Sequence, residues 1–271
     1  MSNTIITAMI SVTAIGFICA IVLAIASKVM SVKVDERVAS IRAGLPGANC
    51  GACGFSGCDG YAVALVNEGA KTNLCTPGGD AVSKAISTIL GVDFEDVIEQ
   101  VAVVHCRGDG KSRQRKMQYS GIRTCSAAKQ IFGGQNACVF GCLGFGDCAE
   151  VCPNDAICIE DGLARIDSRK CSGCGLCAKN CPNGVIFSEA DTITTVITCV
   201  NTEKGAVVRK KCTCGCIACM KCVKECPAEA IKITGNLARI DYDKCTGCGK
   251  CAEICVTNCI QQANFSGIFK N

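Results

Sequence analysis

The chain of 271 residues contains no tryptophan, one histidine and only 4% aromatic residues. Large aromatic side chains usually dominate core packing, so we expect thin cores whose centres are filled by something other than side chains. The single histidine, His105, argues against mixed Cys/His zinc sites. No G-x-G-x-x-G follows a strand, no P-loop is present and no catalytic triad is recognisable. We therefore expect no nicotinamide or flavin site and no nucleic-acid partner.

Cysteine is what the chain has in excess, with 28 residues mostly in regularly spaced groups. The spacing C-x2-C-x2-C-x3-C is that of bacterial ferredoxins, where three cysteines bind one [4Fe–4S] cluster and the fourth binds its neighbour. Disulfide frameworks lack this regularity, and zinc ribbons use two separated C-x2-C pairs, so both alternatives are disfavoured. The pattern predicts a protein that moves single electrons. It occurs three times, in Cys171, Cys174, Cys177 and Cys181, in Cys216, Cys219, Cys222 and Cys226, and in Cys245, Cys248, Cys251 and Cys255.

The first 27 residues carry no charged side chain, and residues 4–25 are almost wholly apolar. A bilayer-spanning helix needs about 20 such residues, which predicts a transmembrane anchor over residues 1–28. A cleaved signal peptide is the main alternative, but the basic segment that should precede its apolar core is missing. The positive-inside rule then predicts a single-pass protein of the cell membrane with its cluster domains in the cytoplasm. The basic residues that follow the span are Lys28, Lys33, Arg37 and Arg42.

A small cluster domain is predicted over residues 29–104. Residues 61–69 suit a short helix closed by a glycine, which would return the chain so that a distant cysteine can reach the same cluster. The irregular spacing leaves a zinc site open as the alternative. Residues 80–104 mix helical and strand patterns and complete the domain. Its expected ligands are Cys50, Cys53, Cys58 and Cys75.

The carboxyl half repeats itself at a constant offset of 74 residues. The segment Leu163–Asp167 recurs unchanged as Leu237–Asp241, and strands are expected at residues 156–159 and 230–233. We therefore predict a connecting segment over residues 105–134, module 1 over 135–190 and module 2 over 191–271. The offset relates Cys125, Cys138, Cys142, Cys148, Cys152, Cys171, Cys174, Cys177 and Cys181 to Cys199, Cys212, Cys216, Cys222, Cys226, Cys245, Cys248, Cys251 and Cys255.

Residues 45–62 resemble the signature of the B subunit of the Rnf complex, a membrane-bound, ion-translocating ferredoxin:NAD⁺ oxidoreductase. The likeness covers the whole chain, because an apolar amino-terminal segment, this cluster domain and ferredoxin modules follow in the same order. A similar cluster domain also resembles part of a corrinoid iron–sulfur protein. The predicted fold class is α+β, with one transmembrane helix, a [4Fe–4S] domain and two tandem two-cluster ferredoxin modules.

The resemblance implies an electron-relay subunit of a translocase. Such a subunit accepts electrons from soluble ferredoxin and passes them to other membrane subunits and finally to NAD⁺, while the complex pumps Na⁺ or H⁺. Substrate conversion would take place on other subunits. Two alternatives stay open: an electron-transfer subunit of a hydrogenase or formate dehydrogenase complex, and a cluster-bearing scaffold or activator.

Each module resembles a two-cluster ferredoxin, which implies its ligand sets. In module 1, Phe145 stands where module 2 has Cys219, so Cys138 is the expected substitute. Cys212 and Cys219 compete for one place in module 2, and we favour Cys219. With the first domain this predicts five [4Fe–4S] clusters. The four module sets are Cys152, Cys171, Cys174 and Cys177; Cys138, Cys142, Cys148 and Cys181; Cys226, Cys245, Cys248 and Cys251; and Cys216, Cys219, Cys222 and Cys255.

Eight cysteines and one basic stretch have no role in the predicted cluster sites. No spacing demands a sixth cluster, so the cysteines are expected to be small buried thiols. The basic stretch is either a solvated loop or a docking surface for an acidic electron carrier. The cysteines are Cys19, Cys106, Cys125, Cys158, Cys199, Cys212, Cys214 and Cys259, and the basic residues are Lys111, Arg113, Arg115 and Lys116.

Overall fold

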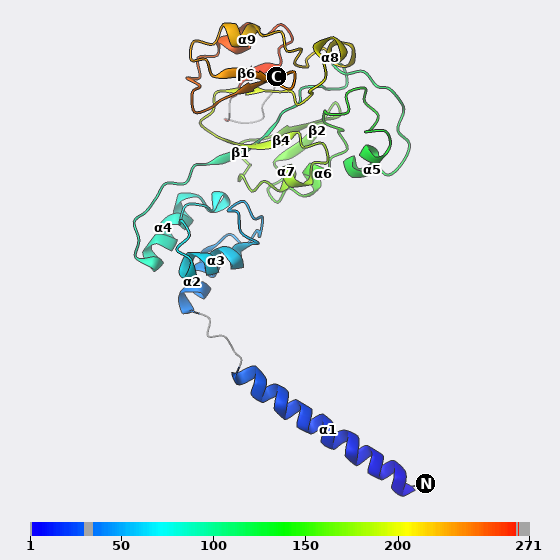
Figure 1. Ribbon diagram of the computed structural model, residues 1–271, viewed down its shortest axis with the longest axis vertical. Coiled ribbons are helices and arrows are strands. Elements are labelled where there is room, and N and C mark those ends of the chain that lie inside the picture. The colour runs from blue at the N-terminus through cyan, green and yellow to red at the C-terminus, as the bar shows by residue number, and fades with distance from the viewer. Residues whose placement is uncertain (1, 30–34, 264, 266–271) are drawn as a thin grey trace.

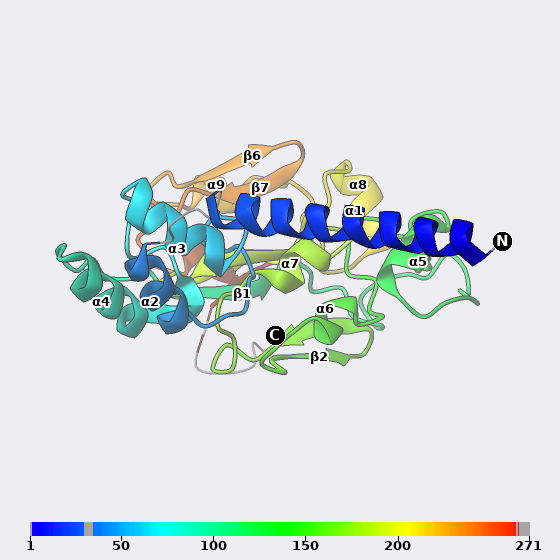
Figure 2. The same cartoon turned by 90° about the horizontal axis from the view of Figure 1, so that it is seen from below.

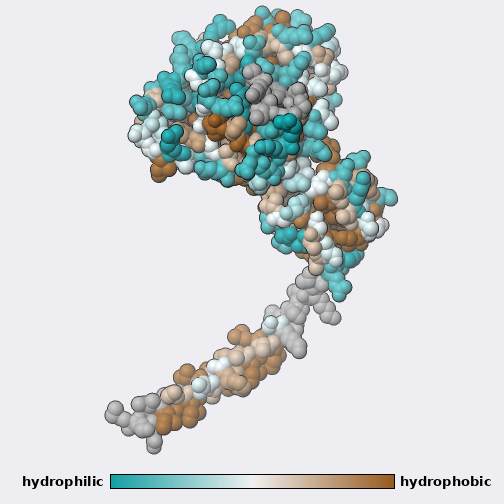
Figure 3. Space-filling model, turned by 180° about the vertical axis from the view of Figure 1, so that it is seen from behind, coloured by the Kyte–Doolittle hydropathy of each residue, from teal (hydrophilic) through white to brown (hydrophobic). Residues whose placement is uncertain are grey.

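The computed structural model describes residues 2–29, 35–263 and 265. Helix α1 (Ser2–Val29) lies apart from the rest of the described chain in Figure 1 and is largely hydrophobic in Figure 3. Its apolar side chains are exposed, from Ile6 at 51% to Ile25 at 59%. No helix among the described residues is identified as long and apolar enough to cross a membrane, so the predicted anchor stays a prediction. Lys33 lies outside the described residues, as do 264 and 266–271 of the predicted second module.

Three helices and a short 3₁₀ turn form the first domain. They are α2 (Glu36–Gly44), α3 (Cys58–Asn67), η1 (Thr76–Gly78) and α4 (Gly79–Leu90). As predicted, a glycine ends α3: Gly69 adopts a φ of 65°, and the N–H of Ala70 donates to the carbonyl of Ala64. Ile41, Tyr61 and Ile86, one from each helix, are almost fully buried against one another in the domain core.

Module 1 is built from two small antiparallel sheets and three short helices. Strand β2 (Ile157–Glu160) pairs with β3 (Leu163–Ile166), and β1 (Gln100–Val104) pairs with β4 (Ile186–Ala190). The helices are α5 (Cys125–Gln130), α6 (Asp147–Glu150) and α7 (Leu176–Asn180). We predicted that residues up to 104 belong to the first domain. Instead β1 leaves that domain and completes a sheet of module 1, as Figure 1 shows.

Module 2 repeats this plan. Strand β6 (Ile231–Thr234) pairs with β7 (Leu237–Ile240), and β5 (Thr195–Ile197) pairs with β8 (Ile260–Gln262). Its helices are α8 (Gly205–Lys211), α9 (Lys221–Lys224) and α10 (Lys250–Glu253). The hairpin registers correspond, since Ile157 pairs with Ile166 and Ile231 with Ile240. Both predicted hairpin strands are confirmed, and Figure 2 shows β2 and β6 on opposite sides of the paired modules.

The two modules obtain their first strand from different parts of the sequence. An offset of 74 from β5 would place this strand at residues 121–123, but module 1 uses β1, about 20 residues earlier. The pairing is nevertheless equivalent. The N–H of His105 donates to Val185 at 2.7 Å, and the N–H of Thr198 donates to Cys259 at 2.8 Å. Sheet pairing therefore makes Cys106, not Cys125, the spatial counterpart of Cys199.

Candidate functional site

The cysteines predicted for the first domain come together beside α3. Asn49 orders the loop before this helix, because its side-chain oxygen accepts a hydrogen bond from the N–H of Cys58 at 2.9 Å. Burial raises the pKa of the Cys75 thiol, and the neighbouring thiolates raise it further, although the N–H of Gly78 opposes the rise. We name this group site A, which comprises Cys50, Cys53, Cys58 and Cys75.

Two further groups have the composition expected from the sequence. Burial and the adjacent thiols raise the pKa of Cys177 to about 12 in one group, and that of Cys251 to about 11 in the other. The second group lines a cavity. We name them site C, with Cys152, Cys171, Cys174 and Cys177, and site E, with Cys226, Cys245, Cys248 and Cys251.

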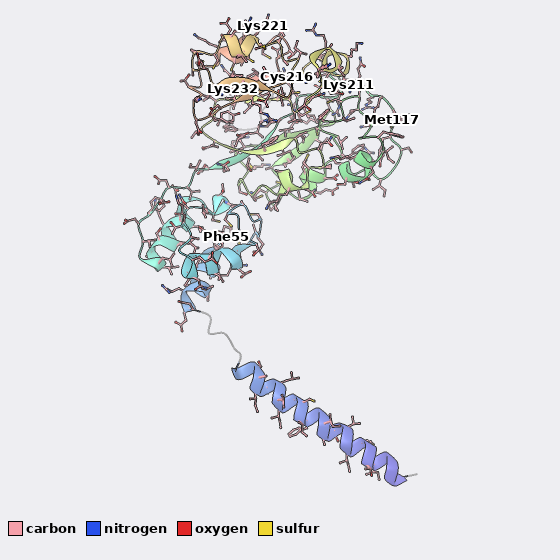
Figure 4. The ribbon with its side chains drawn as sticks, viewed as in Figure 1. Phe55, Met117, Lys211, Cys216, Lys221 and Lys232 are labelled. Carbon is pink, nitrogen blue, oxygen red and sulfur yellow. The ribbon has the colours of Figure 1, made fainter. Side chains whose placement is uncertain are left out.

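The remaining group of module 2 contains Cys219 and not Cys212. Burial raises the pKa of Cys222 to about 11, with added contributions from four neighbouring thiols, three of which belong to the same group. One of these belongs to Cys216, which lies inside module 2 in Figure 4. Cys212 lies elsewhere, with its Sγ 3.4 Å from that of Cys214. We name this group site D, which comprises Cys216, Cys219, Cys222 and Cys255.

The corresponding group of module 1 departs from the prediction at one position. Cys125 occupies the position at which Cys138 was expected. It lies close to Cys148, because its thiol contributes, after burial, to raising the pKa of Cys148 to about 12. Cys138 points to another place, where the side-chain amide of Asn201 donates to its Sγ at 3.4 Å. We name this group site B. It lines a cavity and comprises Cys125, Cys142, Cys148 and Cys181.

Asp147 positions Cys125 in site B. Its carboxylate accepts hydrogen bonds from the N–H of Cys125 at 2.6 Å and from the N–H and hydroxyl of Ser126, both at 3.0 Å. Burial would raise the pKa of Asp147, but these donors outweigh it and hold the pKa below its ordinary value. Thr124 caps the helix by accepting from Ala127 at 3.1 Å. The sequence held one indication of this arrangement, an unassigned cysteine upstream of a module that lacks a ligand.

Backbone N–H groups point at the sulfurs of the groups. In three places, the second cysteine of a Cys-x3-Cys pair accepts a hydrogen bond at its sulfur. The donor is the backbone N–H four residues further along the chain. The distances are 3.3 Å from Ala156 to Cys152, 3.4 Å from Ala230 to Cys226 and 3.2 Å from Cys259 to Cys255. Donors of this kind stabilise negative charge on sulfur and tune the reduction potential of a cluster.

The donor set fits iron–sulfur clusters. Burial is the largest cause of the raised pKa values of Cys75, Cys148 and Cys177, and repulsion between neighbouring thiolates adds to it. The positive charge of iron offsets that repulsion. All cysteines of the described chain are free thiols. Among the described residues, no three His, Cys, Asp or Glu side chains are gathered so as to hold a single metal ion.

One residue of the basic stretch is not available for docking. Arg113 is only 8% exposed, and its guanidinium donates to the carbonyls of Cys142 and Gly162, the latter at 2.7 Å. The predicted docking surface is therefore reduced to Lys111, Arg115 and Lys116, which are exposed.

Three family models match parts of the chain. An Fe-S cluster family matches residues 45–77, a 4Fe-4S binding domain matches residues 164–187, and a 4Fe-4S dicluster domain matches residues 215–259. The first match contains site A and the third contains site D. Site B, with its irregular ligand spacing, is the group least covered by these models.

Relatives match over most of the chain. The B subunit of the Na⁺-translocating ferredoxin:NAD⁺ oxidoreductase complex of Acetobacterium woodii is 41% identical over 90% of this chain and 74% of its own length. The B subunit of the ion-translocating oxidoreductase complex of Methanosarcina acetivorans is 38% identical over 96% of this chain and 99% of its own. The proton-translocating counterpart of Clostridium ljungdahlii is 38% identical over 96% and 93%. The chain belongs to the B-subunit family of these ion-translocating oxidoreductase complexes.

Membership of this B-subunit family confirms the resemblance inferred from residues 45–62. It also makes the protein a subunit of an oxidoreductase complex. The matched 4Fe-4S models confirm the type of cluster. They do not give the number of clusters, which we infer from the grouping of the cysteines.

Proposed function

We propose that this B subunit carries single electrons from reduced soluble ferredoxin through [4Fe–4S] clusters at sites A to E and on to membrane partner subunits. Each transfer oxidises one cluster and reduces the next by one electron, with no bond made or broken. The gathering of twenty thiols into five groups carries the proposal. The names of the relatives, which are ferredoxin:NAD⁺ oxidoreductase subunits, support the donor and the direction.

The contacts between groups support an order along the relay. Lys179, on the helix between Cys177 and Cys181, donates to the carbonyl of Cys50 at 2.5 Å, so sites A and C adjoin. The thiol of Cys177 affects the pKa of Cys148, which joins sites C and B, and that of Cys251 affects Cys222, which joins sites E and D. The relay thus has two continuous stretches, A–C–B and D–E.

A close approach of the backbone helps to place site C against the strand that links the first domain to module 1. A Cβ at Gly173, whose φ is 67°, would lie 2.3 Å from the carbonyl oxygen of Gln100 and 2.9 Å from the methyl of Thr76. Only glycine allows both the positive φ and this contact. The loop that carries Cys171 and Cys174 is thereby held against β1, close to the turn that follows Cys75 in site A.

Helix α1 is proposed to anchor the relay in the cell membrane, with the cluster domains on the cytoplasmic side. Exposed apolar side chains such as Met9, Phe17 and Leu23 are costly in water but favourable in lipid. One relative is named as Na⁺-translocating and another as proton-translocating. The names therefore support both ions as candidates for transport by the complex that contains this chain.

Iron and acid-labile sulfide analysis of the full-length chain, purified anaerobically in detergent, tests the relay. Five clusters require about 20 iron atoms and as many sulfides per chain, and reduced ferredoxin should reduce them within milliseconds. A count of about 4 iron atoms or fewer would contradict the relay. A full complement of clusters that ferredoxin cannot reduce would instead favour a scaffold or activator.

A further inference from the structure

A third cavity lined by cysteines, besides those at sites B and E, lies between the two modules. Its thiols belong to none of sites A to E. Three segments that are far apart in sequence supply them: the connecting segment, module 1 and the start of module 2. The cysteines that line it are Cys106, Cys138, Cys199, Cys212 and Cys214.

Four of these five thiols form two pairs related by the repeat. Cys106 and Cys199 each follow the residue whose N–H pairs with the opposite strand, so they correspond in space. Cys138 and Cys212 correspond at the sequence offset of 74. With the connecting segment counted with module 1, each module therefore contributes one thiol of each kind. Cys214 has no counterpart, because Phe140 stands at the equivalent position in module 1.

The surroundings of the paired thiols also correspond. The sulfur of Cys199 accepts from the N–H of Asn201 at 3.4 Å, and that of Cys106 accepts from Cys142 at 3.4 Å and from Gly108, two residues on. Backbone N–H groups two and three residues on point at the sulfur of Cys138 and, in the same way, at that of Cys212. Sulfurs of sites C, D and E also receive backbone N–H donors, there from the residue four positions further on.

The connecting segment holds the two halves of this cavity together. Gln114 donates its N–H to the carbonyl of Lys211, next to Cys212, at 2.9 Å. Its carbonyl accepts from the N–H of Ala137, next to Cys138, at 2.8 Å. The buried guanidinium of Arg113 donates to the carbonyls of Cys142 and Gly162, so a positive charge lies near Cys106 and Cys212, where a cluster would carry negative charge.

We propose that Cys106, Cys138, Cys199 and Cys212 bind a sixth [4Fe–4S] cluster at the interface of the two modules. The inference rests on the proposed relay and completes it. The sulfur of Cys106 touches the backbone of Cys142 in site B, and the backbone N–H of Cys216 in site D points at the sulfur of Cys199. The sixth cluster therefore joins the stretches A–C–B and D–E into one line.

A zinc ion is the main rival for four thiolates. Zinc needs only a tetrahedron of sulfurs about 2.3 Å from the metal and no cavity beyond it. Here the thiols line a cavity, as those of sites B and E do, and their sulfurs receive the same kind of backbone donors as the cluster sulfurs. It also lies between two redox sites, where a zinc ion would carry no electrons.

Iron, sulfide and zinc analysis of the full-length, anaerobically reconstituted chain tests this proposal. Six clusters predict about 24 iron atoms and 24 sulfides, and native mass spectrometry should give the same stoichiometry. About 20 iron atoms, with or without one zinc ion, would overturn the sixth site while leaving the five-cluster relay intact. A count near 4 would instead remove the relay itself.

Alanine variants identify the ligands. Cys106→Ala and Cys199→Ala should each lose about 4 iron atoms, whereas neither should lose any if only sites A to E hold clusters. The double variant Cys138→Ala/Cys199→Ala should lose no more than either single variant, because both thiols serve one cluster. A loss of two clusters would overturn the assignment of Cys138.

Two matched controls accompany these variants. Cys214→Ala removes a buried thiol from the same cavity, and Cys158→Ala removes an exposed thiol from β2. Both should retain the full iron count. A loss of iron in Cys214→Ala would overturn the assignment of the four ligands. If a ligand variant fails to fold, the wild-type stoichiometry and native mass still decide whether the sixth cluster exists.

Discussion

Modules 1 and 2 share hairpin registers yet fill one ligand position from different places. In module 2 the position belongs to Cys219, inside the regular ferredoxin run. In module 1 that place holds Phe145, which packs edge-on against Tyr119 with ring centroids 5.4 Å apart, and Cys125 arrives from α5. The comparison teaches that a cluster site specifies where a sulfur must lie, not which segment supplies it. It also explains why Cys199, the sequence counterpart of Cys125, is free for another task.

The two modules also differ in what supports that position. Asp147 in module 1 holds the backbone of Cys125, whereas the equivalent residue of module 2 is the exposed Lys221. Module 2 needs no such carboxylate, because Cys219 lies within its own ligand loop. An irregular ligand thus requires an additional residue to position it.

Removal of Cys125 should have the largest effect that follows from this comparison. Cys125→Ala should lose the cluster of site B, about 4 iron atoms and 4 sulfides, just as Cys219→Ala should lose that of site D. Iron and sulfide analysis of the anaerobically purified chain measures both losses. A full iron count in Cys125→Ala would show that Cys125 is not a ligand of site B.

Phe145→Cys provides a rescue within the same experiment. It restores the regular C-x2-C-x2-C spacing between Cys142 and Cys148 in module 1, so the double variant Cys125→Ala/Phe145→Cys should regain the lost cluster. Rescue would separate the loss of a ligand from a folding defect, because the Cys125→Ala substitution is still present. Failure of the rescue, with the chain folded, would mean that residue 145 does not face site B.

Sequence reasoning reached the elements whose determinants are local. The hairpins β2–β3 and β6–β7 and the return of the chain to Cys75 follow from short patterns and from a regular offset. It missed the pairing of strand β1 with β4, which lies more than 80 residues further along the chain. That one pairing moves Cys106 into register with Cys199, which the linear repeat cannot reveal. Cys125 was missed for a related reason, since an aspartate 22 residues away positions it.

Asp147→Asn should have an intermediate effect. The amide keeps one acceptor oxygen but loses the charge, and a hydrogen bond to a charged group contributes about 1.5–3 kcal/mol. We expect the opening free energy of α5 to fall by about that amount, measured by hydrogen exchange of the amides of residues 125–130. Lys221→Ala, at the equivalent exposed position of module 2, should change exchange in α9 very little. Equal effects in the two modules would contradict the positioning role of Asp147.

The smallest expected effect concerns the exposed basic residues beside module 1. If ferredoxin docks there, Lys111→Gln, Arg115→Gln and Lys116→Gln together should slow reduction by ferredoxin about 3- to 10-fold at low salt, because complementary charge raises the encounter rate. The difference should fade as added salt screens the charges. Stopped-flow reduction measures the rate. Lys221→Gln with Lys224→Gln is the matched control, since module 2 carries these lysines where module 1 has Asp147 and Glu150. A rate that falls only in this control pair would move the docking site from the connecting segment to module 2, and would make the D–E end of the relay the entry.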